Sequence, residues 1–300
     1  MIRTFVKTLA EGFLMGSANL VPGVSGGTIA LVLGIYERLI DSITEGSSAL
    51  GALVKGDLKG SSQRFRQVEW PFLLSMMAGI LLAVVLLAAF LERQLEEHPT
   101  VLAAAFFGLV VGSIIVAWRL LESPGPPHLV LATVVGVVLF VLLGLGGTSE
   151  AIDPGLIAFF GAGALAICAM ILPGLSGSLL LILVGMYAAV LAAVNDRDFQ
   201  SVAVFALGAI IGLALFSQIL HWALEHHHDF LLAGLVGLMA GSLRILWPWP
   251  EAEVGLAGRP LAAPGDHWVV ALLASVVGLS AVFLISRIGD ARGANQESAE

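Results

Sequence analysis

The chain has 300 residues, of which 58% are hydrophobic and only 12% are charged, and its mean hydropathy is +0.97. Soluble domains carry about 25% charged residues, so this composition excludes an ordinary soluble protein and indicates a membrane protein. The formal net charge of -8 lies in loops and tails and does not point to a nucleic-acid partner. Because the chain has a single cysteine, Cys168, an intramolecular disulfide is excluded.

The first segment, 5–40, is apolar but contains a break. Glu11 interrupts it and no A-x-A-like cleavage site follows, so we interpret it as a retained membrane element rather than a signal peptide. It is too long for one span, and Pro22 and Gly23 at its centre break a helix. Two conformations remain open: a re-entrant hairpin that returns to its own side of the membrane, or one broken helix that crosses it.

A polar stretch, 41–69, follows, and we expect it to form a cytoplasmic loop. Beyond it the chain contains six apolar runs, most of them long enough to cross a bilayer, which requires about 20 residues. All six tryptophans lie at the ends of these runs, where an aromatic belt meets the lipid headgroups. The runs are Phe72–Leu91, Val101–Leu121, Leu129–Leu145, Val202–Trp222, Phe230–Leu246 and Trp268–Ile285.

The second half of the chain repeats the first. Gly12–Tyr36 aligns with Gly163–Tyr187 at a constant offset of 151, and the pattern Pro-Gly-x-Ser-Gly occurs in both. Farther along, Gly108 aligns with Gly237 at an offset of 129, so the first copy carries extra residues within its polar stretch. We therefore predict two copies of one unit, each a motif segment followed by three spans. The copies are 1–150, with motif segment 5–40, and 151–300, with motif segment 155–194.

Positive charges favour one topology for these copies. If both motif segments re-enter, ten of the 14 lysines and arginines lie on one side and only Arg93, Arg197, Arg244 and Arg259 lie on the other. This split places the ten, and both termini, in the cytoplasm. A crossing motif would fit the charges less well, whereas a motif made of two full spans has the same parity and stays possible. Because three crossings are an odd number, we expect the second copy to be inverted.

Each Pro-Gly-x-Ser-Gly break leaves backbone N–H groups that need partners inside the protein or in a polar cavity. A half-helix that begins near Ser25 or Ser176 would present N–H groups, hydroxyls and a positive dipole end, which together suit an anion. Two inverted broken helices that meet near the midplane form the substrate site of secondary transporters. Alternatively, the small residues only permit close helix packing. The motif residues that we predict to bind substrate are Asn19, Ser25, Gly26, Gly27, Thr28, Ser176, Gly177 and Ser178.

Three ionisable residues beside apolar sequence complete the predicted substrate site. Glu37 and Arg38 follow the first motif, and Arg244 lies near the end of the fifth apolar run. Most arginines at span ends extend to the interface, but Arg244 is the strongest candidate because Ile115 occupies the equivalent position of the first copy. The run His226–His228 could bind a metal, but a solvated turn between helices is the commoner role, and we expect neither a metal nor a cofactor.

Several of these sequences resemble a bacterial and archaeal family long known as a domain of unknown function. The resemblance is carried by 15–28, 34–37, 172–178, 241–244 and 247–249, and it spans nearly the whole chain. Members of that family are described as undecaprenyl-phosphate (polyprenyl-phosphate) translocases. The resemblance implies a flippase of the cytoplasmic membrane that returns this lipid phosphate from the outer to the inner leaflet for cell-envelope synthesis.

The combined prediction is an all-α polytopic membrane protein with two inverted repeats, which carries a polyprenyl phosphate by alternating access around a midplane anion site. One alternative is an ion-coupled carrier of a small soluble anion, which would share the architecture. The other is an intramembrane serine protease, because 23–26 and 174–177 both match the short string Gly-x-Ser-Gly. No histidine lies in the middle of a predicted span to act as the base, so we do not expect an enzyme.

Overall fold

The computed structural model describes residues 2–21, 23–145, 154–250, 258, 260–265 and 267–297. For residues 2, 3 and 288–297 only the backbone is described. Pro22 of the first motif and Arg259 lie outside the described residues. Over the described ranges the fold is all-helical, as the sequence predicts, apart from one isolated antiparallel bridge between Pro250 and Leu261.

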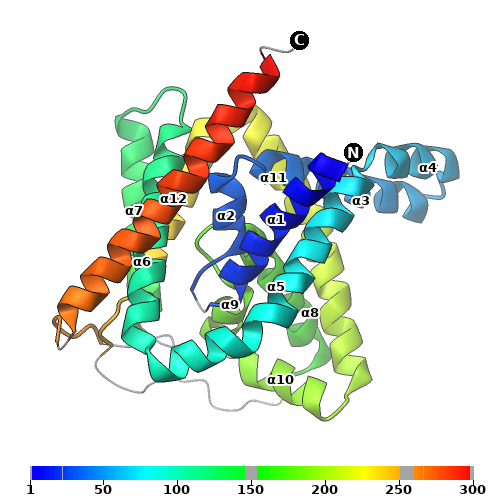
Figure 1. The fold of residues 1–300 in the computed structure, drawn as a ribbon. Coiled ribbons are helices and arrows are strands. Elements are labelled where there is room, and N and C mark those ends of the chain that lie inside the picture. Colours follow the sequence, from blue (N-terminus) through cyan, green and yellow to red (C-terminus); the bar gives the residue numbers. More distant parts are fainter. Residues whose placement is uncertain are drawn as a thin grey trace.

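The described residues form twelve helices, which are labelled in Figure 1. They are α1 (Ile2–Asn19), α2 (Gly26–Val32), α3 (Tyr36–Val54), α4 (Leu58–Gln67), α5 (Trp70–Glu97), α6 (Pro99–Arg119), α7 (Pro126–Leu145), α8 (Leu156–Ile171), α9 (Gly177–Leu183), α10 (Tyr187–Asn195), α11 (Phe199–Ser242) and α12 (Trp268–Glu297).

Five of the described helices are long and apolar enough to cross a membrane: α5, α6, α7, α11 and the Trp268–Arg287 part of α12. Each of the six apolar runs lies largely within one of them, because the 44-residue α11 holds two. Large apolar side chains cover their outer surfaces, and Val85 and Val277 are 80% and 66% exposed. Such surfaces suit lipid and not water. The chain is therefore a multi-pass membrane protein.

The two spans within α11 are joined by a kink. His227 has a φ of -141° and a ψ of 41°, which are not helical values. The sequence predicts a turn at this histidine run, but the chain changes direction there within a kinked helix. Next to the kink, the Asp229 carboxylate accepts hydrogen bonds from the backbone N–H groups of Glu122 and Ser123, at 3.0 and 2.8 Å. These bonds tie the kink to the connection between α6 and α7.

Both motif segments are broken helices. Six residues separate Asn19, the end of α1, from Gly26, the start of α2, and five residues separate Ile171, the end of α8, from Gly177, the start of α9. Within the breaks, Gly23 and Gly174 have φ values of +87° and +84°, a left-handed conformation that a glycine adopts without strain. After its break the second segment bends again, by 112° between α9 and α10. In Figure 1, α10 lies at the end of the molecule opposite to the N-terminus and α4.

The polar stretch 41–69, which we expected to be a loop, is helical over most of its length. α3 continues to Val54, and α4 follows after a short turn. Asp57 caps α4 because its carboxylate accepts a hydrogen bond from Gly60 N at 2.9 Å. α3 also packs on α11, where the Thr44 hydroxyl donates to Ser217 O at 3.1 Å. Glycines inside a helix cost about 1 kcal/mol each relative to alanine, which this packing offsets.

Glycines bring helix backbones together in the same way in both halves. A Cβ atom added to Gly12 would lie 2.1 Å from Met76 O, and one added to Gly163 would lie 2.0 Å from Phe205 O. These residues are equivalent at the offsets of 151 and 129. Thus α1 packs on α5 as α8 packs on α11. The opposing helices approach in the same way. A Cβ atom added to Gly79 of α5 would lie 2.1 Å from Leu9 O, and one added to Gly208 of α11 would lie 2.0 Å from Phe160 O.

A second set of glycine contacts joins the halves to each other. A Cβ atom added to Gly112 of α6 would lie 3.1 Å from Val282 Cβ of α12, and one added to Gly241 of α11 would lie 2.8 Å from Leu139 Cβ of α7. Accordingly, α6 pairs with α12 and α7 pairs with α11. The second span of each half therefore packs on the third span of the other half, which interlocks them.

We expect Gly163→Val to destabilise the protein, because its Cβ atom would overlap a backbone oxygen of α11 that cannot move by itself. Overpacking of this kind costs roughly 1–3 kcal/mol or more. Gly161→Val is the matched control, since a Cβ atom at Gly161, in the same helix, meets nothing within 4 Å. Thermal unfolding in detergent should give a lower midpoint for the first variant only. Equal midpoints for the two variants would contradict the packing of α8 on α11.

Candidate functional site

The breaks of the two motif segments contact each other directly. The Ser25 hydroxyl, at the start of α2, donates a hydrogen bond to Met170 O at 3.2 Å. The Thr28 hydroxyl accepts one from Gly174 N at 2.9 Å. Both side chains are buried, at 1% and 0% exposure. Gly27 packs closely on the second break, because a Cβ atom there would lie 2.5 Å from the oxygen of Ile171. The first motif therefore uses its side chains to satisfy backbone groups of the second.

The first backbone N–H groups of α2 are already bonded. Gly26 N donates to the Asn19 side-chain oxygen at 2.6 Å, and Gly27 N donates to the Ser25 hydroxyl at 3.1 Å. Thr28 N donates to Ser25 O at 3.0 Å. The sequence predicts that these N–H groups are available for an anion, but in this conformation they are bonded within the first motif. The reason is that Asn19, at the end of α1, reaches across the break and caps the next helix.

The start of α9 is more open than the start of α2. The Ser176 hydroxyl makes no capping hydrogen bond and instead lies 2.8 Å from the hydroxyl of Ser178, which is exposed. The positions equivalent to Asn19 and Thr28 are Met170 and Leu179, which lack polar atoms to close the break. Gly177 follows Ser176 and packs on α8, with Ala166 O 2.9 Å from the place of a Cβ atom. Exposed hydroxyls are thus a feature of the second motif.

Arg244 lies just after α11, and its side chain lies against α7. The guanidinium carbon is 4.8 Å from the centre of the Phe140 ring and lies against Gly144, both on α7. The same segment does reach the first motif, because side-chain atoms of the next two residues, Ile245 and Leu246, would lie 2.9 and 3.4 Å from a Cβ atom added to Gly23. The structure therefore places Arg244 next to this contact in sequence and its guanidinium beside α7.

Glu37 and Arg38, at the start of α3, point to different partners. The Glu37 carboxylate lies 3.4 Å from His228 Nε2 of α11. The Arg38 guanidinium makes a bidentate contact with the Glu69 carboxylate. Its Nε donates to both carboxylate oxygens at 3.1 Å, and its Nη2 donates to Oε2 at 2.5 Å. These hydrogen bonds hold the pKa of Glu69 below its usual value and raise the pKa of Arg38. Both groups are therefore charged at neutral pH.

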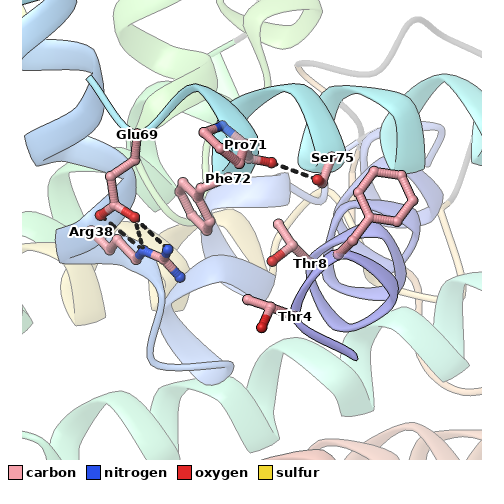
Figure 2. A pocket seen from close by; sticks show the side chains of 8 residues that line it. Thr4, Thr8, Arg38, Glu69, Pro71, Phe72 and Ser75 are labelled. Atoms are coloured by element: carbon pink, nitrogen blue, oxygen red, sulfur yellow. Dashed lines mark hydrogen bonds and ion pairs between the residues drawn. The ribbon is translucent and has the colours of Figure 1, made fainter. Parts of the chain in front are cut away.

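Arg38 and Glu69 stand at one side of a cavity of about 490 Å³ between α1 and the start of α5 (Figure 2). The Arg38 guanidinium also lies 4.1 Å from the centre of the Phe72 ring. The cavity thus combines an ion pair and several hydroxyls with apolar walls. The lining residues are Thr4, Phe5, Thr8, Arg38, Glu69, Pro71, Phe72 and Ser75. The sequence predicts Arg38 as a site residue but not Glu69, whose only signal is its place just before the first apolar run.

The predicted site residues therefore lie at five places: two groups at the motif breaks and three separate charged residues. Asn19, Ser25, Gly26, Gly27 and Thr28 lie together where the motifs touch, and Ser176, Gly177 and Ser178 lie at the start of α9 on the other side of the second break. Arg38 belongs to the cavity beside α1, Glu37 to a contact with α11, and Arg244 to α7.

Comparison with known proteins gives consistent matches over most of the chain. A family model described as undecaprenyl phosphate translocase-like matches residues 15–258. A polyprenyl-phosphate transporter of Vibrio cholerae is 38% identical over 250 residues, which cover 82% of this chain and 79% of that protein. A polyprenyl-phosphate transporter of Staphylococcus aureus is 29% identical over 299 residues, covering 93% and 95% of the two chains. No solved structure matches this chain.

We expect Thr28→Val to lower the stability of the protein, because it leaves the buried Gly174 N–H group without its acceptor. An unsatisfied buried donor costs about 1–3 kcal/mol, which thermal unfolding in detergent would detect. Thr28→Ser keeps the hydroxyl, loses one methyl group and serves as the control. If the valine variant were as stable as the original and the serine variant were weaker, side-chain volume and not the hydrogen bond would hold the motifs together.

Proposed function

The chain belongs to the undecaprenyl phosphate translocase-like family, and we propose that it transports a polyprenyl phosphate across the cytoplasmic membrane of a bacterium or archaeon. The observation that carries this proposal is its similarity, over most of its length, to two proteins named polyprenyl-phosphate transporters. The direction we propose is from the outer to the inner leaflet, which returns the lipid phosphate for envelope synthesis.

We further propose that 1–150 and 151–300 are inverted repeats whose motif segments re-enter the membrane from opposite sides. The sequence repeat, at offsets of 151 and 129, and the equivalent glycine contacts of α1 on α5 and of α8 on α11 support this arrangement. So does the position of α10, at the end of the molecule opposite to the N-terminus (Figure 1). With both termini in the cytoplasm, the excess of basic residues also falls on the cytoplasmic side.

Transport requires a polar route for the headgroup. Burial of an isolated charge in a medium of low dielectric constant costs tens of kcal/mol by ideal estimates, so a phosphate does not cross hydrocarbon unaided. The contact between the motif segments brings polar groups from both breaks together in the core of an otherwise apolar helix bundle. We propose that the headgroup passes there by alternating access while the prenyl tail stays in the lipid.

Within this route, the proposed headgroup contacts are the residues of the two breaks. Ser176, Gly177 and Ser178 offer hydroxyls and the beginning of α9 in the conformation described. Asn19, Ser25, Gly26, Gly27 and Thr28 are engaged with one another and with the second motif. They would become available when that contact opens. The hydroxyls of Ser25 and Ser176 bond to Met170 O and to Ser178, and these contacts do not favour a protease.

We propose that the cavity beside α1 receives the headgroup on the cytoplasmic side. A phosphate can replace a carboxylate in a two-pronged contact with an arginine, so the Arg38–Glu69 pair would open to accept it. The apolar walls formed by Phe5 and Phe72 suit the first prenyl units. Arg244 and Glu37 are proposed as further charged groups along the route, at α7 and at the contact of α3 with α11.

Reconstitution of the protein in liposomes with labelled undecaprenyl phosphate tests this function. We expect the protein to accelerate the loss of headgroup from the outer leaflet relative to empty liposomes. A short-chain prenyl phosphate should compete, whereas the uncharged prenol should not, because the phosphate is the group that the polar route carries. If inorganic phosphate at the same concentration blocked transport as well as the prenyl phosphate does, the protein would be a carrier of small anions instead.

In the same assay, Arg38→Ala should reduce transport by roughly ten- to a hundredfold, since a hydrogen bond to a charged group contributes about 1.5–3 kcal/mol. Arg38→Lys keeps the charge but loses the forked geometry, and it should retain part of the activity. Arg93→Ala is the control, because Arg93 makes its exposed ion pair with Glu97 far from this cavity. An Arg38→Ala protein as active as the control would remove the cavity from the route.

A further inference from the structure

A second cavity, of about 630 Å³, lies between the C-terminal end of α6 and the C-terminal end of the membrane-spanning part of α12. We propose that it binds the phosphate of an anionic phospholipid, which is a lipid of the surrounding leaflet and not the transported substrate. It is separate from the cavity beside α1 and shares no lining residue with it. Its lining residues are Arg119, Ser280, Phe283, Leu284, Ser286 and Arg287.

The two arginines give this cavity its charge. Arg119 is the last residue of α6, and Arg287 is the last residue of the apolar part of α12. Among the side chains that the structure describes, the ion pairs involve other cations: Lys7, Arg38, Arg93 and histidines. Two guanidinium groups therefore face one cavity without a described carboxylate to neutralise them. An anion supplied from outside the chain would do so.

The form of the site suits a lipid headgroup. The Arg119 guanidinium lies 5.5 Å from the centre of the Phe283 ring, which holds it at the cavity. Ser280 and Ser286 add hydroxyls, and the apolar side chain of Leu284 is 63% exposed beside them. A phosphate can thus contact arginines and hydroxyls while its acyl chains lie on apolar side chains. Basic pockets between membrane helices on the cytoplasmic side bind anionic headgroups in this way.

The site also lies next to the first motif. Val32, the last residue of α2, is buried with Val116 of α6 and Val282 of α12, and Phe283 packs against this cluster. A lipid that bridged Arg119 and Arg287 would hold α6 and α12 together around the end of α2. The bound phospholipid should therefore stabilise the folded protein, and this effect does not depend on any transport activity.

The purified full-length protein tests the proposal when it is titrated in a neutral detergent with phosphatidylglycerol or phosphatidylcholine. Phosphatidylglycerol should raise the midpoint of thermal unfolding and phosphatidylcholine should not, because only the former carries a net negative charge. In an Arg119→Gln/Arg287→Gln variant, the apparent affinity for phosphatidylglycerol should fall by about tenfold or more, since contacts between charged groups are the stronger hydrogen bonds. Native mass spectrometry would count the bound lipid.

Two further variants make the result unambiguous. Arg64→Gln/Arg66→Gln removes two exposed charges from α4 and should leave phosphatidylglycerol binding unchanged. Arg119→Lys/Arg287→Lys keeps the charges and should retain most of the binding, even if the glutamine variant folds poorly. Equal losses in the α4 variant and the cavity variant would overturn the proposal, because they would indicate general attraction. Displacement of phosphatidylglycerol by equimolar undecaprenyl phosphate would also overturn it, since the cavity would then belong to the substrate.

Discussion

The contact between the two broken motif segments is the interaction on which the rest of the structure depends. A helix broken inside a membrane exposes backbone groups that lipid cannot satisfy. Here the Ser25 and Thr28 side chains of the first segment bond to backbone atoms of Met170 and Gly174 in the second. The division of roles is unequal, because Asn19 caps α2 while the second segment has no equivalent side chain. The second break therefore depends on side chains of the first for these hydrogen bonds.

Close helix packing keeps the two breaks in register. Glycines let α1 approach α5, and α8 approach α11, so closely that any side chain would collide with the opposing backbone. Since lipid provides no hydrophobic force between helices, such contacts between small residues are what associates them. The pairing of spans from different halves, α6 with α12 and α7 with α11, then keeps the two halves together. The proposed transport requires the centre to change conformation while these outer helices remain packed.

Features of the fold that depend on neighbouring residues could be predicted from the sequence. Features that depend on contacts between distant segments could not. Hydropathy placed the spans, and the Pro-Gly pairs placed the breaks, because both depend on neighbouring residues. The helicity of 41–69 was missed, since its stability comes from packing of α3 on α11, which no local pattern records. For the same reason Ser25 was expected to be available at the start of its helix, whereas its hydroxyl is used by Met170. The partner of Arg38, Glu69, was likewise beyond the reach of sequence.

Cross-linking of the two breaks tests most directly whether the headgroup passes between them. Ser25→Cys and Met170→Cys would be combined in a Cys168→Ala background, where the native contact brings the two positions together. Joining them with a short thiol-specific cross-linker should stop the transport of undecaprenyl phosphate in proteoliposomes, and a cleavable linker should restore it on reduction. Each single-cysteine variant should stay active after the same treatment. Transport at an undiminished rate by the fully cross-linked protein would contradict a route through the motif contact.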